Sequence, residues 1–90
     1  QAATGAGNVV ADNLHMLKGS DRRLKKDIKL IGASPSGLNI YSFKYKDIKF
    51  GKGVFQGVMS DEVPQSAVIK HSDGYDRVDY SKIDVKFNKL

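Results

Sequence analysis

The spacing of apolar residues changes along the chain, and this change constrains the fold more than any other feature. In the first third, Leu24, Ile28 and Ile31 recur at intervals of four and three, the spacing of one face of an amphipathic helix. From Leu38 onward, aromatic or aliphatic residues alternate with polar ones, as they do in a half-buried strand. Both patterns in one short chain predict an α+β fold, in which a helix covers a small sheet.

The predicted amphipathic helix spans Asp21 to Ile31 and has favourable residues at both ends. Ser20 suits the N-cap, and Asp21 places a negative charge in the first turn, where it complements the helix dipole. Gly32 suits the end of the helix. The opposite face carries basic residues, which predicts that it is solvated.

Two further segments have helical spacing. Residues 9–18 fit a short helix, with Asn8 as its N-cap and Gly19 at its end, although a strand also fits so short a run. Residues 81–90 fit a helix or a strand, and the helix is slightly favoured. Residues 1–8 are small and flexible, which predicts a linker or tail.

Four predicted strands follow the amphipathic helix, at residues 38–45, 54–60, 67–71 and 75–79. Ser72-Asp73-Gly74 predicts a hairpin turn between the last two. Gly57 lies inside the second strand and indicates a bulge or a close approach of the backbone. The sequence therefore predicts a small antiparallel sheet of about four strands packed by an amphipathic helix, preceded by an N-terminal helix or stalk segment.

Composition limits how such a domain is stabilised. A chain of 90 residues buries only about 60–65% of its unfolded surface, so its core is thin. It has no cysteine, so neither disulfides nor thiolate–metal sites can add stability, and oligomerisation is the usual remaining means. No apolar run approaches the roughly 18 residues of a membrane helix, so no membrane partner is expected.

The net charge of +5 raises the possibility of nucleic-acid binding, which the pattern of residues does not favour. The lysines alternate with aspartates over the whole length, whereas a binding stripe would cluster them. Tyr41, Phe43 and Tyr45 resemble a platform for stacking bases, but an aromatic face directed to the core is the favoured interpretation.

Other candidate sites are weaker. His15 has no cysteine, histidine or carboxylate at ligand spacing, so neither a metal nor a cofactor is expected. His71 lies near two aspartates in a hairpin, where such residues are usually only exposed. Gly51-Lys52-Gly53 is too short for a phosphate-binding loop. Asp61 and Glu62 are paired carboxylates, but nothing places a substrate between them.

Four segments carry a resemblance to a known family. They are residues 20–28 (Ser-Asp-Arg-Arg-Leu-Lys-Lys-Asp-Ile), 41–45 (Tyr-Ser-Phe-Lys-Tyr), 57–64 (Gly-Val-Met-Ser-Asp-Glu-Val-Pro) and 73–81 (Asp-Gly-Tyr-Asp-Arg-Val-Asp-Tyr-Ser). In order and spacing, from Ser20 to about Ile83, the chain resembles the C-terminal intramolecular chaperone domain of phage tailspikes and tail fibres, the endosialidase-type chaperone. The four segments together make this resemblance fairly specific.

The resemblance implies a domain at the C-terminal end of a homotrimeric phage tail protein, assembled in the host bacterial cytoplasm and bound for the virion. Its partners would be copies of itself and the upstream part of its own chain, with no small-molecule substrate. Residues 1–19 would be upstream linker or stalk, and residues 20–90 the chaperone-like domain. The family is released by autoproteolysis, which here corresponds to cleavage between Gly19 and Ser20, with Lys25 completing a catalytic dyad and Asp21 and Glu62 in support.

The chain departs from the family in two places. Ser60-Asp61-Glu62-Val63 stands where the family usually has Ala-Gln-Glu-Val, and the long C-terminal helices of the family are missing from this shortened form. A non-cleaving tip or knob that stays in the virion is therefore an alternative. A basic nucleic-acid-binding module is a second alternative, based on the charge and the aromatic strand.

Whether the domain is an enzyme depends on Ser20 and Lys25. A serine hydroxyl needs a base, and a lysine serves when burial or nearby positive charge lowers its pKa. Three basic neighbours, Arg22, Arg23 and Lys26, act in that direction. In one regular helix, however, positions five apart are about 140° apart around the axis. The sequence leaves open a single-turnover autoprotease, or a capping serine and a solvated lysine.

Overall fold

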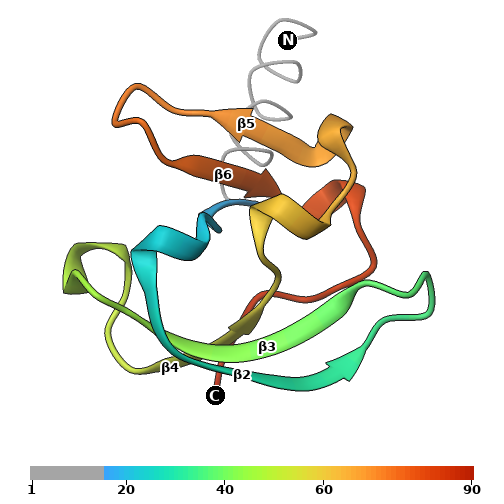
Figure 1. Ribbon diagram of the computed structural model, residues 1–90, viewed down its shortest axis with the longest axis horizontal. Helices are drawn as coiled ribbons and strands as arrows, with labels where there is room; N and C mark the ends of the chain where they lie inside the picture. The colour runs from blue at the N-terminus through green and yellow to red at the C-terminus, as the bar shows by residue number, and fades with distance from the viewer. Residues whose placement is uncertain (1–15) are drawn as a thin grey trace, which may run out of the picture.

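The computed structural model describes residues 16–90, which form two antiparallel sheets (Figure 1). The three-stranded sheet has the order β1 (Leu17–Gly19), β6 (Asp76–Asp79), β5 (Val68–Lys70). The four-stranded sheet has the order β2 (Lys25–Ala33), β3 (Asn39–Tyr45), β4 (Val54–Gly57), β7 (Asn88–Lys89). Figure 1 shows the two sheets one above the other, with the chain passing from β1 to β2 through a short turn between them.

Single 3-10 turns take the place of helices in the described residues. They are η1 (Arg22–Leu24), η2 (Ile48–Phe50), η3 (Ser60–Glu62), η4 (Gln65–Ala67) and η5 (Tyr80–Lys82). Aspartates cap three of them: the side chains of Asp21, Asp47 and Asp79 each accept a hydrogen bond from the amide two residues further on. None of the helices among residues 16–90 is long and apolar enough to cross a membrane.

The prediction of an α+β fold is wrong, because the segment predicted as an amphipathic helix is mainly a strand. Only residues 22–24 turn, and β2 begins at Lys25. Two β-bulges explain the misleading spacing. In the first bulge, Asp27 and Ile28 of β2 lie opposite a single residue of β3. In the second, Ile31 is one extra residue of β2 with no partner in β3. Each inserted residue shifts the alternation of a strand, so intervals of four and three arise without a helix.

α-Helical structure is also absent from the described parts of the two shorter segments with helical spacing. Leu17 to Gly19 form β1 and pair with β6, so Gly19 lies in a strand and does not end a helix. The predicted linker and most of the predicted N-terminal helix fall within residues 1–15, which lie outside the described residues. At the other end, Tyr80–Lys82 form a turn and Asn88–Lys89 a short strand that pairs with β4.

The strand predictions succeed where alternation is regular. Strands lie within all four predicted ranges, and β5 and β6 pair antiparallel as the hairpin signal indicates. The prediction that these four strands form one sheet is wrong, because β3 and β4 belong to the four-stranded sheet and β5 and β6 to the three-stranded one. The aromatic residues of β3 face the core: Phe43 and Tyr45 are buried, and Tyr41 packs against the same cluster.

The core consists of two clusters that meet at Phe87. One contains Leu24, Phe43, Tyr45, Phe55 and Met59, and the other contains Val58, Ala67, Val78, Tyr80 and Val85. Phe87 packs against both clusters. The close backbone approach indicated by Gly57 is confirmed, because a Cβ atom there would lie 2.5 Å from the Tyr80 hydroxyl oxygen.

Candidate functional site

Ser20 and Lys25 are both buried at the junction of the two sheets. Ser20 follows β1 and is 0% exposed, and Lys25 opens β2 and is 2% exposed. Both simple interpretations of these residues are therefore wrong. Asp21, not Ser20, caps the turn between them, and Lys25 is not a solvated lysine.

A chain of hydrogen bonds runs from Ser20 to Lys25 through Tyr80 and Val58. The Ser20 Oγ and Tyr80 Oη atoms lie 3.2 Å apart, within hydrogen-bonding distance. The Tyr80 oxygen accepts from the Val58 amide at 3.0 Å, and the Lys25 ammonium donates to the Val58 carbonyl at 2.6 Å. Ser20 and Lys25 make no direct hydrogen bond with each other: the Ser20 hydroxyl contacts Tyr80, the Lys25 ammonium contacts the Val58 carbonyl, and the Val58 amide contacts Tyr80.

The surroundings of Lys25 favour the neutral amine. The pKa of Lys25 is lowered from 10.5 to about 7, mainly by burial and in smaller part by the positive charge of Arg22, while Asp21 and Asp61 act in the opposite direction. Its nitrogen lies 3.9 Å from the centre of the Phe43 ring. At neutral pH a substantial share of the Lys25 side chains is thus unprotonated and able to accept a proton.

The sequence predicted that the pKa of Lys25 is lowered but not that burial is the main cause. Of the three basic neighbours, only Arg22 contributes to lowering the pKa. Arg23 instead turns toward Asp21, with its guanidinium nitrogens 2.9 and 2.7 Å from the carboxylate. Lys26 is exposed at the surface.

Both polar groups of the Gly19–Ser20 peptide bond are hydrogen bonded, and so is the carbonyl of the following peptide. The Tyr45 hydroxyl donates to the Gly19 carbonyl at 2.7 Å. The Ser20 amide donates to the Asp76 carbonyl at 3.2 Å, and the Ser20 carbonyl accepts from the Ser60 amide at 2.8 Å. The bond predicted to be cleaved is therefore fixed by groups from β3, β6 and η3.

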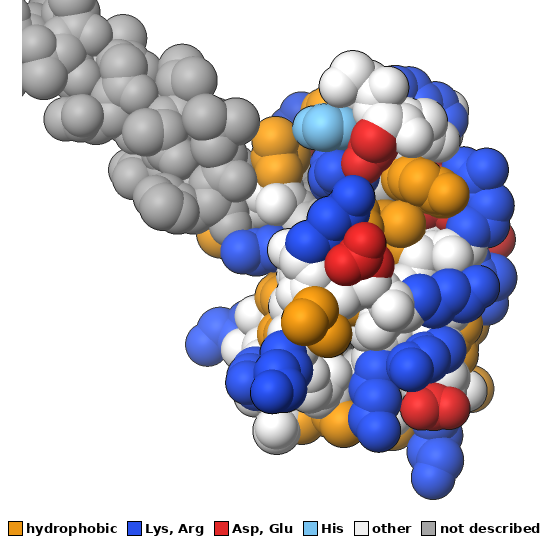
Figure 2. Space-filling view, turned by 90° about the vertical axis from the view of Figure 1, so that its left-hand side faces the viewer, with side chains coloured by type: hydrophobic (Ala, Val, Ile, Leu, Met, Phe, Trp, Pro, Cys, Tyr) orange, Lys and Arg blue, Asp and Glu red, His pale blue; other side chains and the backbone are white. Residues whose placement is uncertain are grey.

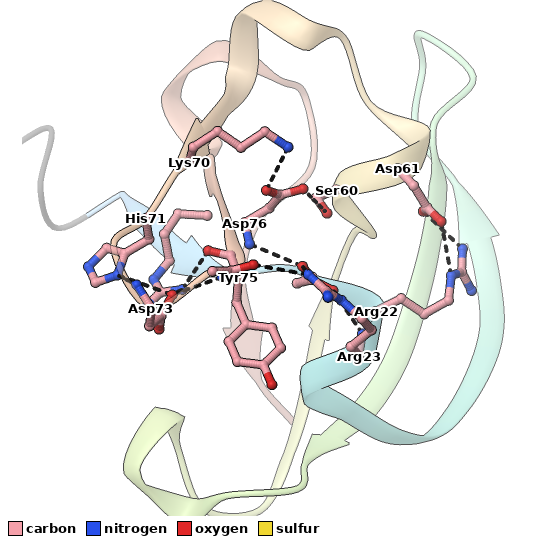
Figure 3. A network of polar contacts seen from close by, with 12 residues as sticks. Arg22, Arg23, Ser60, Asp61, Lys70, His71, Asp73, Tyr75 and Asp76 are labelled. Carbon is pink, nitrogen blue, oxygen red and sulfur yellow. Dashed lines mark hydrogen bonds and ion pairs between the residues drawn. The ribbon is translucent and has the colours of Figure 1, made fainter.

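Asp21 holds the turn beside this bond through contacts with Arg23 and Asp76, two residues that Figure 3 labels. Its carboxylate accepts hydrogen bonds from the Arg23 amide and guanidinium and from the Asp76 amide. These contacts, led by the one with the Arg23 side chain, hold the pKa of Asp21 well below its usual range. Asp21 thus positions the chain between Ser20 and Lys25, in agreement with a supporting role, which stays a prediction.

Glu62 lies on the outer side of the same region. It accepts a hydrogen bond from the Tyr41 hydroxyl at 2.8 Å and pairs with Arg22 at 3.4 Å. Neither contact reaches Ser20 or Lys25 directly. A contribution of Glu62 to the site would act through Arg22, the residue whose charge lowers the pKa of Lys25.

The hairpin between β5 and β6 carries a separate polar group (Figure 3). Asp73 accepts from the Arg77 guanidinium at 2.8 Å, and this contact lowers its pKa to about 2. His71 is exposed beside it, as expected for a hairpin residue. Across residues 16–90 no group of three or more carboxylates and histidines is placed to hold a metal ion. His15 lies outside the described residues.

Sequence reasoning missed Tyr45 and Tyr80 as polar members of the site. Both belong to apolar patterns, and their rings do pack in the core clusters. The available signal was the hydroxyl itself, because a buried tyrosine normally finds a hydrogen-bond partner. The identity of that partner depends on which strands meet, and local spacing does not give it.

A surface pocket of about 560 Å³ lies on the other side of Tyr80. It is lined by Met16, Lys18, Tyr80, Ile83, Asp84, Val85, Lys86, Phe87 and Asn88. Neither Ser20 nor Lys25 lines it, so the pocket does not give a substrate from solution access to these two residues. Comparisons with protein-family models, with curated proteins and with solved structures found no match.

Proposed function

We propose that this domain is a chaperone-like module of a bacteriophage tail protein that cleaves its own chain once, between Gly19 and Ser20. The observation that carries the proposal is the burial of both Ser20 and Lys25, linked through Tyr80 and Val58, with no carboxylate paired to the lysine among the described residues. The resemblance from Ser20 to about Ile83 supplies the biological setting.

Burial limits the substrate to the chain itself. A serine that is 0% exposed cannot reach a peptide in solution, whereas its own preceding carbonyl is always next to it. Burying a lysine without a carboxylate also costs stability. Groups with strongly shifted pKa values concentrate at functional sites, so the burial of Lys25 supports a functional role for it.

The chemistry of the proposed cleavage is an acyl shift followed by hydrolysis. The neutral Lys25 amine takes the Ser20 hydroxyl proton, and Oγ bonds to the Gly19 carbonyl carbon. The C–N bond then breaks, and the Ser20 nitrogen takes the proton back from Lys25, which leaves an ester. Water hydrolyses the ester to a Gly19 carboxylate and a free Ser20 hydroxyl. Lys25 must first leave the Val58 carbonyl, which it contacts here.

Cleavage is tested by the intact mass of the domain expressed with its native upstream chain. The parent is expected to give a fragment that begins at Ser20, while Ser20→Ala and Lys25→Met are expected to remain uncleaved. Lys26→Met is the matched control, because Lys26 is an exposed neighbour on the same strand. A parent that stays intact after folding, or cleavage in both active-site variants, would contradict the proposal.

Assembly into homotrimers is the second part of the proposal. β2 lies at the edge of its sheet and carries exposed apolar side chains, with Leu30 60% and Ile31 46% exposed. An edge strand whose backbone groups are free on one side can pair with another chain, and the exposed apolar side chains on β2 support such a contact. The partner proposed here is another copy of this chain.

The chaperone role predicts that the upstream domain forms fewer trimers when residues 20–90 are deleted. Its yield as trimer is measured by sedimentation after expression with and without these residues. Leu30→Lys in the full chain is expected to lower the yield as well, because it adds a charge to the exposed patch. Ile48→Lys is the control, since Ile48 is 71% exposed and lies outside β2. Equal yields from the full and truncated chains would refute the role.

A non-cleaving structural tip is the competing proposal, and one observation favours it. Ser20 is hydrogen bonded to Tyr80 and Lys25 to Val58, so neither side chain depends on the other for a partner. No buried side-chain nitrogen or oxygen of the described residues is left unpaired. The mass experiment separates the two proposals. Nucleic-acid binding loses its main support, because Phe43 and Tyr45 lie in the core, and Figure 2 shows basic side chains interspersed with acidic and apolar ones.

A further inference from the structure

We infer that Tyr45 is a catalytic residue of the proposed cleavage, with its hydroxyl stabilising the negative charge that develops on the Gly19 carbonyl oxygen. The inference rests on the proposed function and adds a residue that the serine and the lysine do not supply. Its basis is the 2.7 Å hydrogen bond from the Tyr45 hydroxyl to that oxygen. Tyr45 is 26 residues away in sequence and is only 4% exposed.

The Tyr45 ring is fixed by its neighbours. It packs edge-on against Phe43 at 5.3 Å between ring centres, and against Phe55 at 5.5 Å and Phe50 at 5.7 Å. Three aromatic contacts prevent the ring from swinging away, so the hydroxyl is held at the carbonyl before the reaction begins. Electrostatic stabilisation is most effective when the donor is already oriented in this way.

The hydroxyl also keeps its proton under the conditions in which Lys25 is neutral. Burial raises the pKa of Tyr45, while burial lowers that of Lys25 to about 7. The two groups therefore remain in complementary states over a wide range above neutral pH, with one able to accept a proton and the other able to donate a hydrogen bond.

The movement of electrons in the first step shows where this hydrogen bond acts. When the Ser20 oxygen bonds to the Gly19 carbon, the electron pair of the C=O bond moves to the Gly19 oxygen. A hydrogen bond to a charged oxygen is about twice as strong as one to a neutral carbonyl. The contact of Tyr45 thus strengthens in the transition state and again weakens when the ester forms, which is the behaviour that accelerates a reaction.

Tyr45→Phe tests the inference because it removes only the oxygen and keeps the ring. The protein with its upstream chain is refolded from denaturant, and the cleaved fraction is followed by mass. Loss of one such donor lowers a rate about 10²–10³-fold, and we expect a decrease in this range. The pH at half-maximal rate is expected to stay near that of the parent, since Lys25 remains the base. Tyr75→Phe, which packs against the same cluster, is the matched control.

The outcomes distinguish the two proposals. No cleavage in the parent overturns the proposed function itself. If the parent is cleaved and Tyr45→Phe is cleaved at the same rate, only the role of Tyr45 is overturned. A slower Tyr45→Phe whose pH at half-maximal rate has moved also overturns that role, because the change then acts through Lys25. If Tyr45→Phe does not fold, 3-fluorotyrosine at this position, a stronger donor of nearly the same size, must change the rate; an unchanged rate overturns the inference.

Discussion

Replacing Lys25 with methionine is expected to stabilise the folded domain at about pH 6, and the gain is expected to shrink between about pH 7 and pH 10. The protonated ammonium of Lys25 is 2% exposed and has only a carbonyl and an aromatic face as partners. Methionine occupies a similar volume without a charge, so its burial avoids most of the desolvation cost. One hydrogen bond to the Val58 carbonyl is lost, which reduces the gain by about 1 kcal/mol or more.

The pH range follows from the direction of the pKa change. Lys25 has a pKa of about 7 in the folded protein and 10.5 as its ordinary value. Between these values the unfolded chain holds a proton that the folded chain has released. The free energy of unfolding of the parent therefore rises with pH, by up to about 1.4 kcal/mol per pH unit. Below pH 7 both states are protonated, and the parent bears the whole cost of the buried charge.

The upper end of the range is set by the tyrosines. Burial raises the pKa of Tyr45 and of Tyr80, so above about pH 10 the unfolded chain loses these protons first. The free energy of unfolding then falls with rising pH in both the parent and the variant. The difference between the two proteins removes this common contribution and isolates Lys25.

The measurement is urea unfolding over this pH range in a Ser20→Ala background, which prevents the proposed cleavage from complicating the comparison. Lys26→Met in the same background is the control, because Lys26 is exposed on the neighbouring position of β2. Parallel stability curves for the Lys25 variant and its background would show that Lys25 is not a buried base.

A methyl group added at Gly57 is expected to destabilise the domain by about 2–6 kcal/mol. Its Cβ atom would lie 2.5 Å from the Tyr80 hydroxyl oxygen and 3.3 Å from carbons of Phe43 and Phe87. Overpacking of a core costs about 1–3 kcal/mol. Displacing the tyrosine oxygen also leaves the buried Val58 amide without its acceptor, for about 1–3 kcal/mol more.

Thermal and urea unfolding of Gly57→Ala test this expectation. Gly32→Ala is the control, because a Cβ atom at Gly32 meets nothing within 4 Å. Adding Tyr80→Phe to Gly57→Ala removes the clashing oxygen, so the double variant is expected to lose less than the sum of the two single changes. A Gly57→Ala protein within about 0.5 kcal/mol of its parent would show that the Tyr80 hydroxyl is not held against the backbone.

The sequence predicted the strands well and the first third of the chain badly, and the reason lies in β2. In β3, alternation of residues is unbroken from Tyr41 to Tyr45, so period and structure agree. In β2, Asp27 has a φ of 52° and begins the first bulge, a conformation that nothing in the local pattern signals. Ile28 and Ile31 then fall at helical intervals because the two bulges insert extra residues into the strand, and not because the segment is a helix.

The candidate site shows a similar division. The resemblance selected Ser20 and Lys25, and the structure places both in one buried hydrogen-bonded chain. The helical period placed them on different faces, an objection that disappears because the turn between them is only three residues long. Tyr45 and Tyr80 reach the site from distant parts of the chain, so only the packing of the two sheets reveals them.

The pairing of β1 with β6 determines what the proposed cut would accomplish. β1 ends at Gly19 and so belongs to the upstream product, yet it pairs with β6 of the downstream product at three positions, from Leu17 opposite Asp79 to Gly19 opposite Arg77. Breaking the Gly19–Ser20 bond would therefore convert one chain into a noncovalent complex. Separation becomes a second event, with its own rate and its own dependence on temperature and denaturant. The cut would end the covalent connection, and the pairing of β1 with β6, together with the contacts of Met16 and Gly19, would then oppose separation of the products.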